Sequence, residues 1–139
     1  MLKLRAENAD DLTVFGGYLQ DATIRVGDIA WLPQQHRLAL VCNRFMWERE
    51  NKPWLRTRCG LHFETVSKAQ TRGIPMNEKD HILELLTVHA VEQDSRALIT
   101  LAFAGGADIR LEAEVVDAEL TDLGAPWETP NRPMHDDEE

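Results

Sequence analysis

The chain has 139 residues, of which 43% are hydrophobic and 28% charged, and its formal net charge is −9. This length fits one domain with a sizeable core, and the composition excludes an intrinsically disordered chain. The negative charge argues against a surface that is basic everywhere, so we expect no DNA partner. No apolar run approaches the roughly 20 residues that span a bilayer, so we expect no membrane partner.

The first residues and the two cysteines indicate where the protein is located and whether it holds a metal or cofactor. The first residues lack the apolar stretch and cleavage site of a signal peptide, which predicts a cytoplasmic protein. Cys42 and Cys59 lie in separate strand-like stretches, without the close spacing of a metal knuckle or redox motif. We therefore expect two buried thiols in a reducing compartment, and neither a metal nor a cofactor.

The N-terminal segment predicts a strand followed by a helix. Residues 2–5 alternate apolar and basic side chains, as a short strand does. Asn8 is placed as an N-cap, and apolar residues then recur at helical spacing at Leu12, Phe15, Leu19 and Ala22. Gly16 and Gly17 weaken this helix, so it must pack against another element, which we expect to be a sheet.

Alternating and β-branched residues follow over 23–26, 29–32 and 37–47, with a turn at 33–36. The last two of these segments predict a hairpin. Its second arm is apolar on both faces, which is typical of a central strand covered on both sides.

The next segments predict further strands. After a charged turn at 48–53, residues 55–73 are expected to form one long strand with a bulge near Glu64. Residues 77–91 fit either a capped helix or a strand, and we favour a strand from about Ile82.

The C-terminal part predicts a second hairpin and a tail. Strands 98–103 and 109–116 flank a Gly-Gly pair, which supplies the positive φ angles of a tight turn. Residues 115–123 either continue the strand or form a short helix. We expect one compact domain over residues 1–127 and a flexible acidic tail over 128–139.

Together these elements predict an α+β fold of about seven strands. The strands would form a bent antiparallel sheet or a half-open β-barrel, with the N-terminal helix packed across it. A pleckstrin-homology-like roll is one such shape.

Common catalytic patterns are missing from the sequence. Neither serine lies in a Gly-x-Ser-x-Gly elbow, and Gly105-Gly106 is followed by a strand pattern without the Lys-Ser or Lys-Thr of a phosphate loop. The pair His62 and Glu64 matches half of a zinc deaminase signature, but no Pro-Cys-x-x-Cys follows. We therefore assign no catalytic residues.

Positive charge is concentrated in the middle of the chain. Residues 34–73 contain eight basic and three acidic side chains, although the whole chain is acidic. Strand alternation places the side chains of Arg56, Arg58, His62 and Glu64 on one face. Guanidinium groups bind carboxylates and phosphates, and a neighbouring indole can stack on a base or on another arginine. The candidate anion site comprises Arg44, Trp47, Trp54, Arg56, Arg58, His62 and Glu64.

Two interpretations of these residues stay open. In the first, the arginines neutralise the acidic remainder of the chain, through intrachain pairs or a self-complementary dimer contact. Alternatively, they hold a small anionic ligand. We predict a non-catalytic binding or assembly module using this Arg-rich central face, with a homo-oligomer or another protein as partner. The alternative is a small enzyme, or a protein that binds an anionic metabolite or nucleotide, acting at Arg56, Arg58, His62 and Glu64.

Several stretches together resemble a known family. They are Gly27-Asp-Ile-Ala-Trp-Leu-Pro33, Asn43-Arg-Phe-Met-Trp-Glu48, Gly60-Leu-His-Phe63, Phe103-Ala-Gly-Gly106, Ile109-Arg-Leu-Glu112 and Leu120-Thr-Asp-Leu-Gly-Ala-Pro-Trp127. The combination resembles the bacterial domain of unknown function 2948 family over nearly the whole chain, excluding the tail. The resemblance implies a compact bacterial cytosolic domain and implies no particular activity.

Overall fold

The structure, a computed structural model, describes residues 1–133. Residues 134–139, which belong to the predicted tail, lie outside the described part. One α-helix, α1 (Ala9–Leu19), accompanies eleven strands. The strands are β1 (Lys3–Ala6), β2 (Thr23–Arg25), β3 (Ile29–Leu32), β4 (Arg37–Phe45), β5 (Leu55–Phe63), β6 (Val66–Arg72), β7 (Ile82–Gln93), β8 (Arg96–Phe103), β9 (Asp108–Ala113), β10 (Ala118–Asp122) and β11 (Trp127–Glu128).

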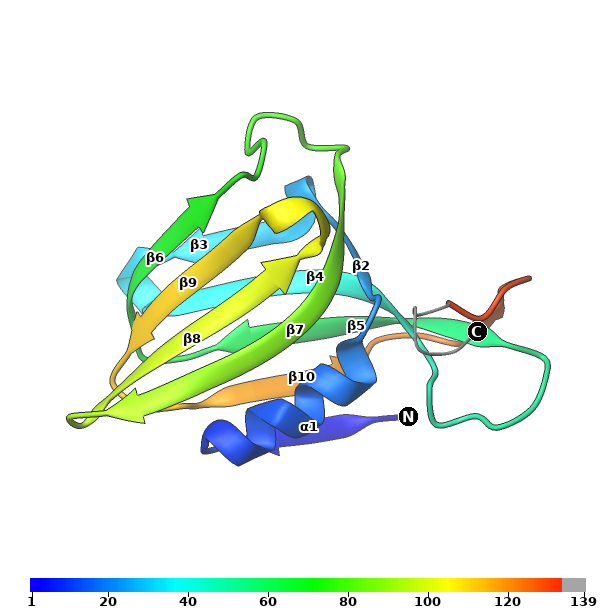
Figure 1. Cartoon of the computed structure of the whole chain (residues 1–139), viewed down its shortest axis with the longest axis horizontal. Helices are drawn as coiled ribbons and strands as arrows, with labels where there is room; N and C mark the ends of the chain where they lie inside the picture. Colours follow the sequence, from blue (N-terminus) through cyan, green and yellow to red (C-terminus); the bar gives the residue numbers. More distant parts are fainter. Residues whose placement is uncertain (134–139) are drawn as a thin grey trace.

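All the strand pairings are antiparallel, as the sequence predicted. The main path of the sheet runs β1-β10-β5-β4-β2-β7-β8-β9-β6, and β3 and β11 pair with β4 and β5. The sheet bends into two walls (Figure 1): β7, β8, β9 and β6 form one, and β3, β4, β5, β10 and β1 form the other. Strand β2 joins the walls because it pairs with both β4 and β7.

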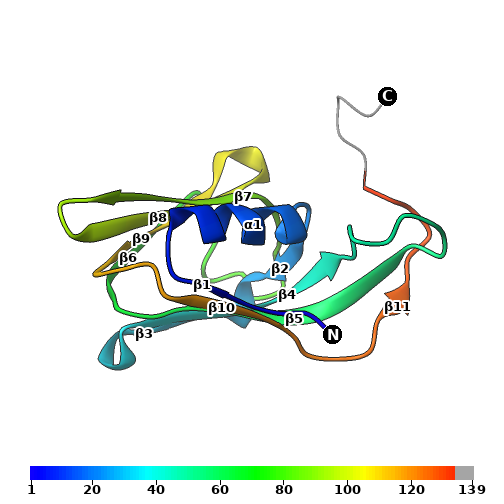
Figure 2. The same ribbon diagram turned by 90° about the horizontal axis from the view of Figure 1, so that it is seen from below.

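Helix α1 lies between β7 of one wall and β1 of the other (Figure 2). Its N-cap is the predicted one, since Asn8 Oδ1 accepts a hydrogen bond of 2.8 Å from the Asp11 amide. Leu12, Phe15 and Leu19 are buried against the sheet. The helix approaches β7 closely at Gly16, where an added Cβ would lie 3.4 Å from the Val88 carbonyl oxygen. The predicted α+β class with an N-terminal helix is therefore confirmed.

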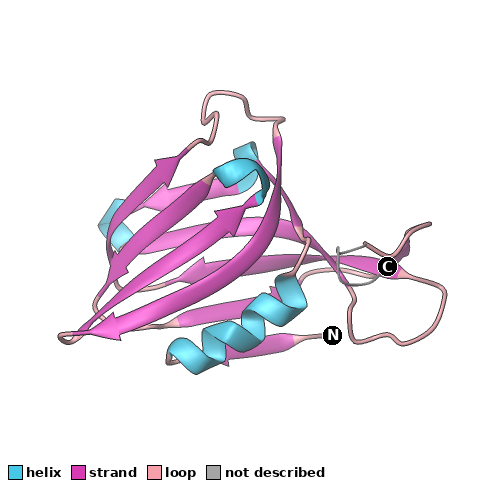
Figure 3. Ribbon diagram, viewed as in Figure 1, coloured by secondary structure: helices cyan, strands magenta, loops and turns pink. Residues whose placement is uncertain are grey.

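The core fills the space between the two walls with alternate side chains from each strand. On β4 the inward residues Leu38, Leu40 and Cys42 are buried. The outward residues Ala39 and Val41 are only half-buried. The prediction that this strand is covered on both sides was wrong here, because within residues 1–133 no second layer lies over the outer face of β4 (Figures 2 and 3).

The number of strands is larger than the seven predicted. The expected long strand over 55–73 is divided into β5 and β6 at Glu64 and Thr65, where Thr65 has a φ of 60°. The chain turns there from one wall to the other, so the two halves belong to different layers. The short strand β11, which the sequence did not predict, adds to the total. The two segments left open by the sequence, 77–91 and 115–123, contain the strands β7 (82–93) and β10 (118–122).

The segment after β10 runs back along β5. Trp127 of β11 pairs with Arg56, and the Thr129 amide donates to the Trp54 carbonyl oxygen at 2.9 Å. The first residues of the predicted tail are therefore attached to the domain. Within residues 1–133, no helix is long and apolar enough to cross a membrane.

Candidate functional site

Strand β5 carries the predicted row of polar side chains on its outer face. Arg56, Arg58, His62 and Glu64 point outward, while the residues between them are buried in the core. The row is nevertheless not one site. Leu123 covers Gly60, where an added Cβ would meet the Leu123 Cδ1 atom at 3.5 Å. This leucine separates the two arginines from the histidine and the glutamate.

A cleft of about 320 Å³ opens beside Arg58. It lies where β4 changes partner, since Leu40 is opposite Ile29 of β3 and Asn43 is opposite Thr23 of β2. A volume of this size is at the lower end of the range for small-molecule sites. The lining consists of Thr23, Arg25, Asp28, Val41, Cys42, Asn43, Arg58 and Ile82.

The two arginines of the cleft are held to different degrees. Arg25 donates to Asp80 at 2.7 Å and to Asp28 at 3.3 Å, and these hydrogen bonds raise the pKa of Arg25. Among residues 1–133, the single ion pair of Arg58 joins its Nη2 to an Asp28 oxygen at 3.9 Å, and its side chain is 54% exposed. Such a distance is too long for a hydrogen bond. Arg58 is therefore the more loosely held cation.

Arg56 contributes to the structure beside the cleft. Its Nη1 donates to the backbone oxygens of Asn43 at 3.2 Å and Asp21 at 3.4 Å, and its guanidinium lies 5.8 Å from the centre of the Phe45 ring. Burial lowers the pKa of Arg56. These contacts connect β5 with β4 and with the end of α1, and Arg56 is not among the residues lining the cleft.

Arg44 points into the protein, away from the cleft. Its Nε and Nη2 donate to the two Asp122 oxygens at 2.9 and 3.0 Å, and Nη1 and Nη2 donate to Glu48 at 2.9 and 2.8 Å. Burial disfavours the Arg44 cation, but the bonds to both carboxylates raise its pKa overall. The strand alternation of β4 places Asn43 outward instead. Including Arg44 in the anion site was therefore an error.

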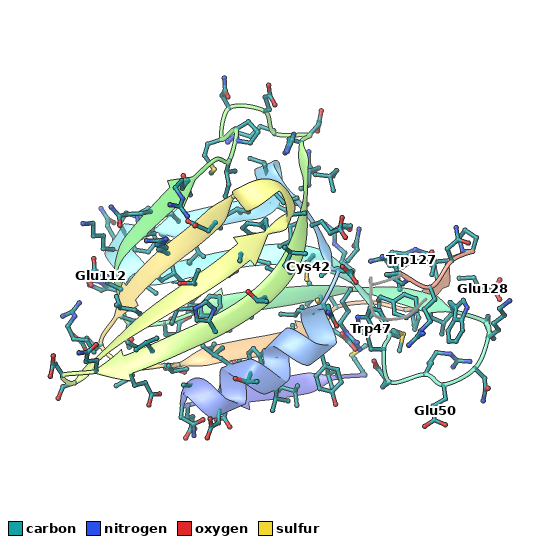
Figure 4. All side chains as sticks on the ribbon, in the orientation of Figure 1. Cys42, Trp47, Glu50, Glu112, Trp127 and Glu128 are labelled. Atoms are coloured by element: carbon teal, nitrogen blue, oxygen red, sulfur yellow. The ribbon has the colours of Figure 1, made fainter. Side chains whose placement is uncertain are left out.

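Trp47 and Trp54 lie at the end of the molecule near β11, at a distance from the cleft. In Figure 4, Trp47 lies toward the side of the molecule that carries Trp127 and Glu128, whereas Cys42 is nearer the middle of the sheet. The indole of Trp47 donates to the Gln20 carbonyl oxygen at 2.8 Å. The Arg132 guanidinium lies 5.4 and 5.8 Å from the ring centres of Trp47 and Trp54. The expected stacking of an arginine on these rings thus occurs within the chain.

His62 belongs to a separate network of charged side chains. Its Nδ1 lies 2.7 Å from Glu64, and its Nε2 lies 3.2 Å from Glu119. Arg37 also donates to Glu64 at 2.7 Å. Burial raises the pKa of Glu64, but the bonds from Arg37 and His62 outweigh it and lower the pKa below its usual value. Both ring nitrogens of His62 are engaged, so the arrangement offers no free base to a substrate.

Across the described residues 1–133, no group of three or more histidine, cysteine or carboxylate side chains is arranged to hold a metal ion.

Of the residues lining the cleft, sequence reasoning predicted only Arg58 and missed, among others, Arg25, Asp28 and Asn43. Arg25 and Asp28 precede the charged middle segment, so a count of charge along the chain did not include them. The residues come together through the pairing of β2 with β4, which places Thr23 opposite Asn43, twenty positions further along the chain. That register depends on tertiary packing and leaves no local signal.

Comparison with known proteins gives one match. No curated protein and no solved structure matches the chain. The model of a family described as "Protein of unknown function (DUF2948)" matches residues 2–135, and the chain therefore belongs to the DUF2948 family.

Proposed function

We propose that this protein is a non-catalytic binding module that holds a small phosphate- or carboxylate-bearing ligand in the cleft between β2, β4 and β5. The observation that carries the proposal is the Arg58 side chain, which is 54% exposed beside a polar cleft and whose guanidinium, within residues 1–133, is paired only at 3.9 Å. A guanidinium in this state can form two parallel hydrogen bonds to an oxyanion without first breaking a short ion pair.

The other groups lining the cleft suit an anion of modest size. Arg25 is already paired with Asp28 and Asp80, so the positive charge that an anion would neutralise is that of Arg58. Asp28 keeps Arg25 in place through the hydrogen bond to its Nη2. Asn43 adds a side-chain amide that can donate to a ligand oxygen. Two cationic groups and an amide surround a cleft of about 320 Å³, and together they can donate hydrogen bonds to a phosphate or carboxylate group.

The absence of an acid and base pair in this cleft favours binding over catalysis. The one histidine near the central arginines, His62, is engaged by Glu64 and Glu119 and is separated from Arg58 by Leu123. A general base must reach the proton that it removes. We therefore rank the small enzyme below the binding module.

The proposal also includes a cellular location and a more specific architecture. We place the binding in the bacterial cytoplasm, and we describe the architecture as a roll of the pleckstrin-homology kind, because a bent antiparallel sheet packs against one helix. A partner protein or a second copy is the runner-up occupant of the outer face. The half-buried Ala39 and Val41 and the exposed Leu123 favour it, since they leave apolar surface on that face.

Isothermal titration calorimetry with inorganic pyrophosphate tests the anion site. We compare the native chain with Arg58→Gln and with a matched control, Arg110→Gln. Arg110 is 58% exposed and has an ion pair of 3.7 Å, but it lies on β9 in the other wall. We expect Arg58→Gln to weaken binding by at least about tenfold, which corresponds to about 1.4 kcal/mol, and Arg110→Gln to leave it unchanged.

An equal loss in both variants would mean that the charge of the whole surface attracts the anion, and the site would be rejected. The absence of binding to the native chain would overturn the anion proposal for this class of ligand. Native mass spectrometry of the same samples would then show whether the chain self-associates.

A further inference from the structure

We propose that Cys42 and Cys59 form a reversible dithiol–disulfide pair, a modification site that reacts with low-molecular-weight disulfides. The two residues are directly opposite each other on the paired strands β4 and β5. Their Sγ atoms are 2.8 Å apart, and their exposed fractions are 2% and 0%. Both are free thiols in the structure.

The backbone already satisfies the geometry that a disulfide requires. Opposite residues of antiparallel strands have Cα atoms about 4.5 or 5.5 Å apart, and both values lie within the range of about 4.4–6.8 Å seen in disulfides. The pair sits inside a continuous ladder that extends from Leu38 opposite Phe63 to Phe45 opposite Arg56. The strands are therefore held in register, and bond formation requires only that the sulfur atoms approach by a further ~0.8 Å.

The Cys42 Sγ atom faces the core, so a small reagent reaches it only when β4 opens locally. Opening is easier at Cys42, which lies between the β4 residues that pair with β3 and β2, Leu40 and Asn43, beside the cleft. Cys59 is held on both sides, by Cys42 of β4 and by Asp122 of β10. We therefore assign the first reaction to Cys42 and the second to Cys59.

The chemistry consists of two thiol–disulfide exchanges. The Cys42 thiol loses its proton, and its sulfur attacks one sulfur of the small disulfide, so that one small thiolate leaves and takes up that proton. The Cys59 thiol then loses its proton, and its sulfur attacks Cys42 Sγ, which releases the second small thiol. The protein loses two electrons and two protons, and the small disulfide is reduced to two thiols. Excess small thiol reverses both steps.

The rate of the first step is limited by the protonation of Cys42. The contact with Cys59 and burial raise the pKa of Cys42, and the nearby Arg44 only partly counters this. Since the thiolate is the attacking species, oxidation at neutral pH is slow compared with that of an exposed cysteine. This behaviour is typical of a thiol pair that stays reduced until the concentration of disulfide rises.

The test uses the native chain and hydroxyethyl disulfide, a neutral reagent, followed by intact mass measurement after denaturation and alkylation. We expect the protein to lose two hydrogen atoms, carry no small-thiol adduct and take up no alkylating reagent, and dithiothreitol should restore the starting mass. A chain that keeps both thiols, accumulates a stable mixed disulfide or forms disulfide-linked dimers would overturn the proposal.

Single variants test the order of the two steps. Cys59→Ser should stop at a mixed disulfide on Cys42, whereas Cys42→Ser should react at least about tenfold more slowly because Cys59 is paired with a strand on both sides and opens less readily. Equal rates would contradict the assignment of the first step. The result for the native chain stands even if a variant fails to fold. Since the reagent is neutral and the readout is covalent, a failure of anion binding at Arg58 would leave this test unaffected.

Discussion

Replacing Arg44 by methionine removes the cation that joins Asp122 and Glu48 in a buried charged cluster. The Arg44 side chain is fully buried, with two hydrogen bonds to Asp122 and two to Glu48. Glu48 is 36% exposed and can return to water. Asp122 is 5% exposed and would keep one hydrogen bond, from the Leu2 amide at 2.8 Å. Breaking a buried ion pair by removing one partner costs about 3–5 kcal/mol, so we expect Arg44→Met to lose that much unfolding free energy.

A second substitution separates the cost of the stranded charge from the cost of lost packing. In Arg44→Met/Asp122→Asn the carboxylate is gone, but the amide oxygen can still accept from Leu2. We expect the double variant to recover more than about half of the loss, because a neutral amide is cheaper to bury than an unpaired carboxylate. Urea unfolding followed by tryptophan fluorescence measures both values. A loss below about 1 kcal/mol for Arg44→Met, or no recovery in the double variant, would refute this reasoning.

Three further predictions concern stability. An added Cβ at Gly17 meets no atom within 4 Å, so Gly17→Ala should raise the unfolding free energy by about 0.5–1 kcal/mol in urea, and a decrease would show an unrecognised contact at α1. Arg132→Ala should cost about 0.5–1 kcal/mol and change the emission of the tryptophans beneath it, whereas an unchanged spectrum would place Arg132 away from the rings. Hydrogen bonds lower the pKa values of Glu48, Glu64 and Asp122, so the unfolded chain binds protons first as the pH falls. Their stabilisation should be complete above pH about 4.5 and should disappear as the pH falls through the lowered folded-state values, and a urea midpoint that stays constant in this range would contradict it.

The helix and the hairpins could be predicted because their signals are local. Asn8 lies three residues before the amide that it caps, and the apolar residues of α1 follow at helical spacing. The glycine pair between β8 and β9 has the positive φ angles of 85° and 84° that the turn requires. The outward row of β5 follows from alternation alone.

The incorrect predictions involve partners that are distant in the chain. A buried arginine needs a carboxylate partner. The partner of Arg44 is Asp122, which is 78 positions away and gives no local signal, so Arg44 was grouped with the outward arginines. The alternation of residues 55–73 shifts near Glu64, but it does not distinguish a bulge from a division into two strands, because the pairing of β6 with β9 is not a local signal. Arg25 was missed for the same reason, since only the pairing of β2 with β4 brings it to the cleft.

The arginine side-chain Nε–H signals of the ¹⁵N-labelled native chain, titrated with inorganic pyrophosphate, test the central claim most directly. We predict saturable shifts of Arg58 and Arg25 and of the Asn43 side-chain amide, with one common dissociation constant, while Arg110 on the other wall stays unchanged. Shifts of similar size at Arg110 and at Arg58, rising without saturation, would show that the anion is attracted by exposed arginines in general, and the cleft would not be its site.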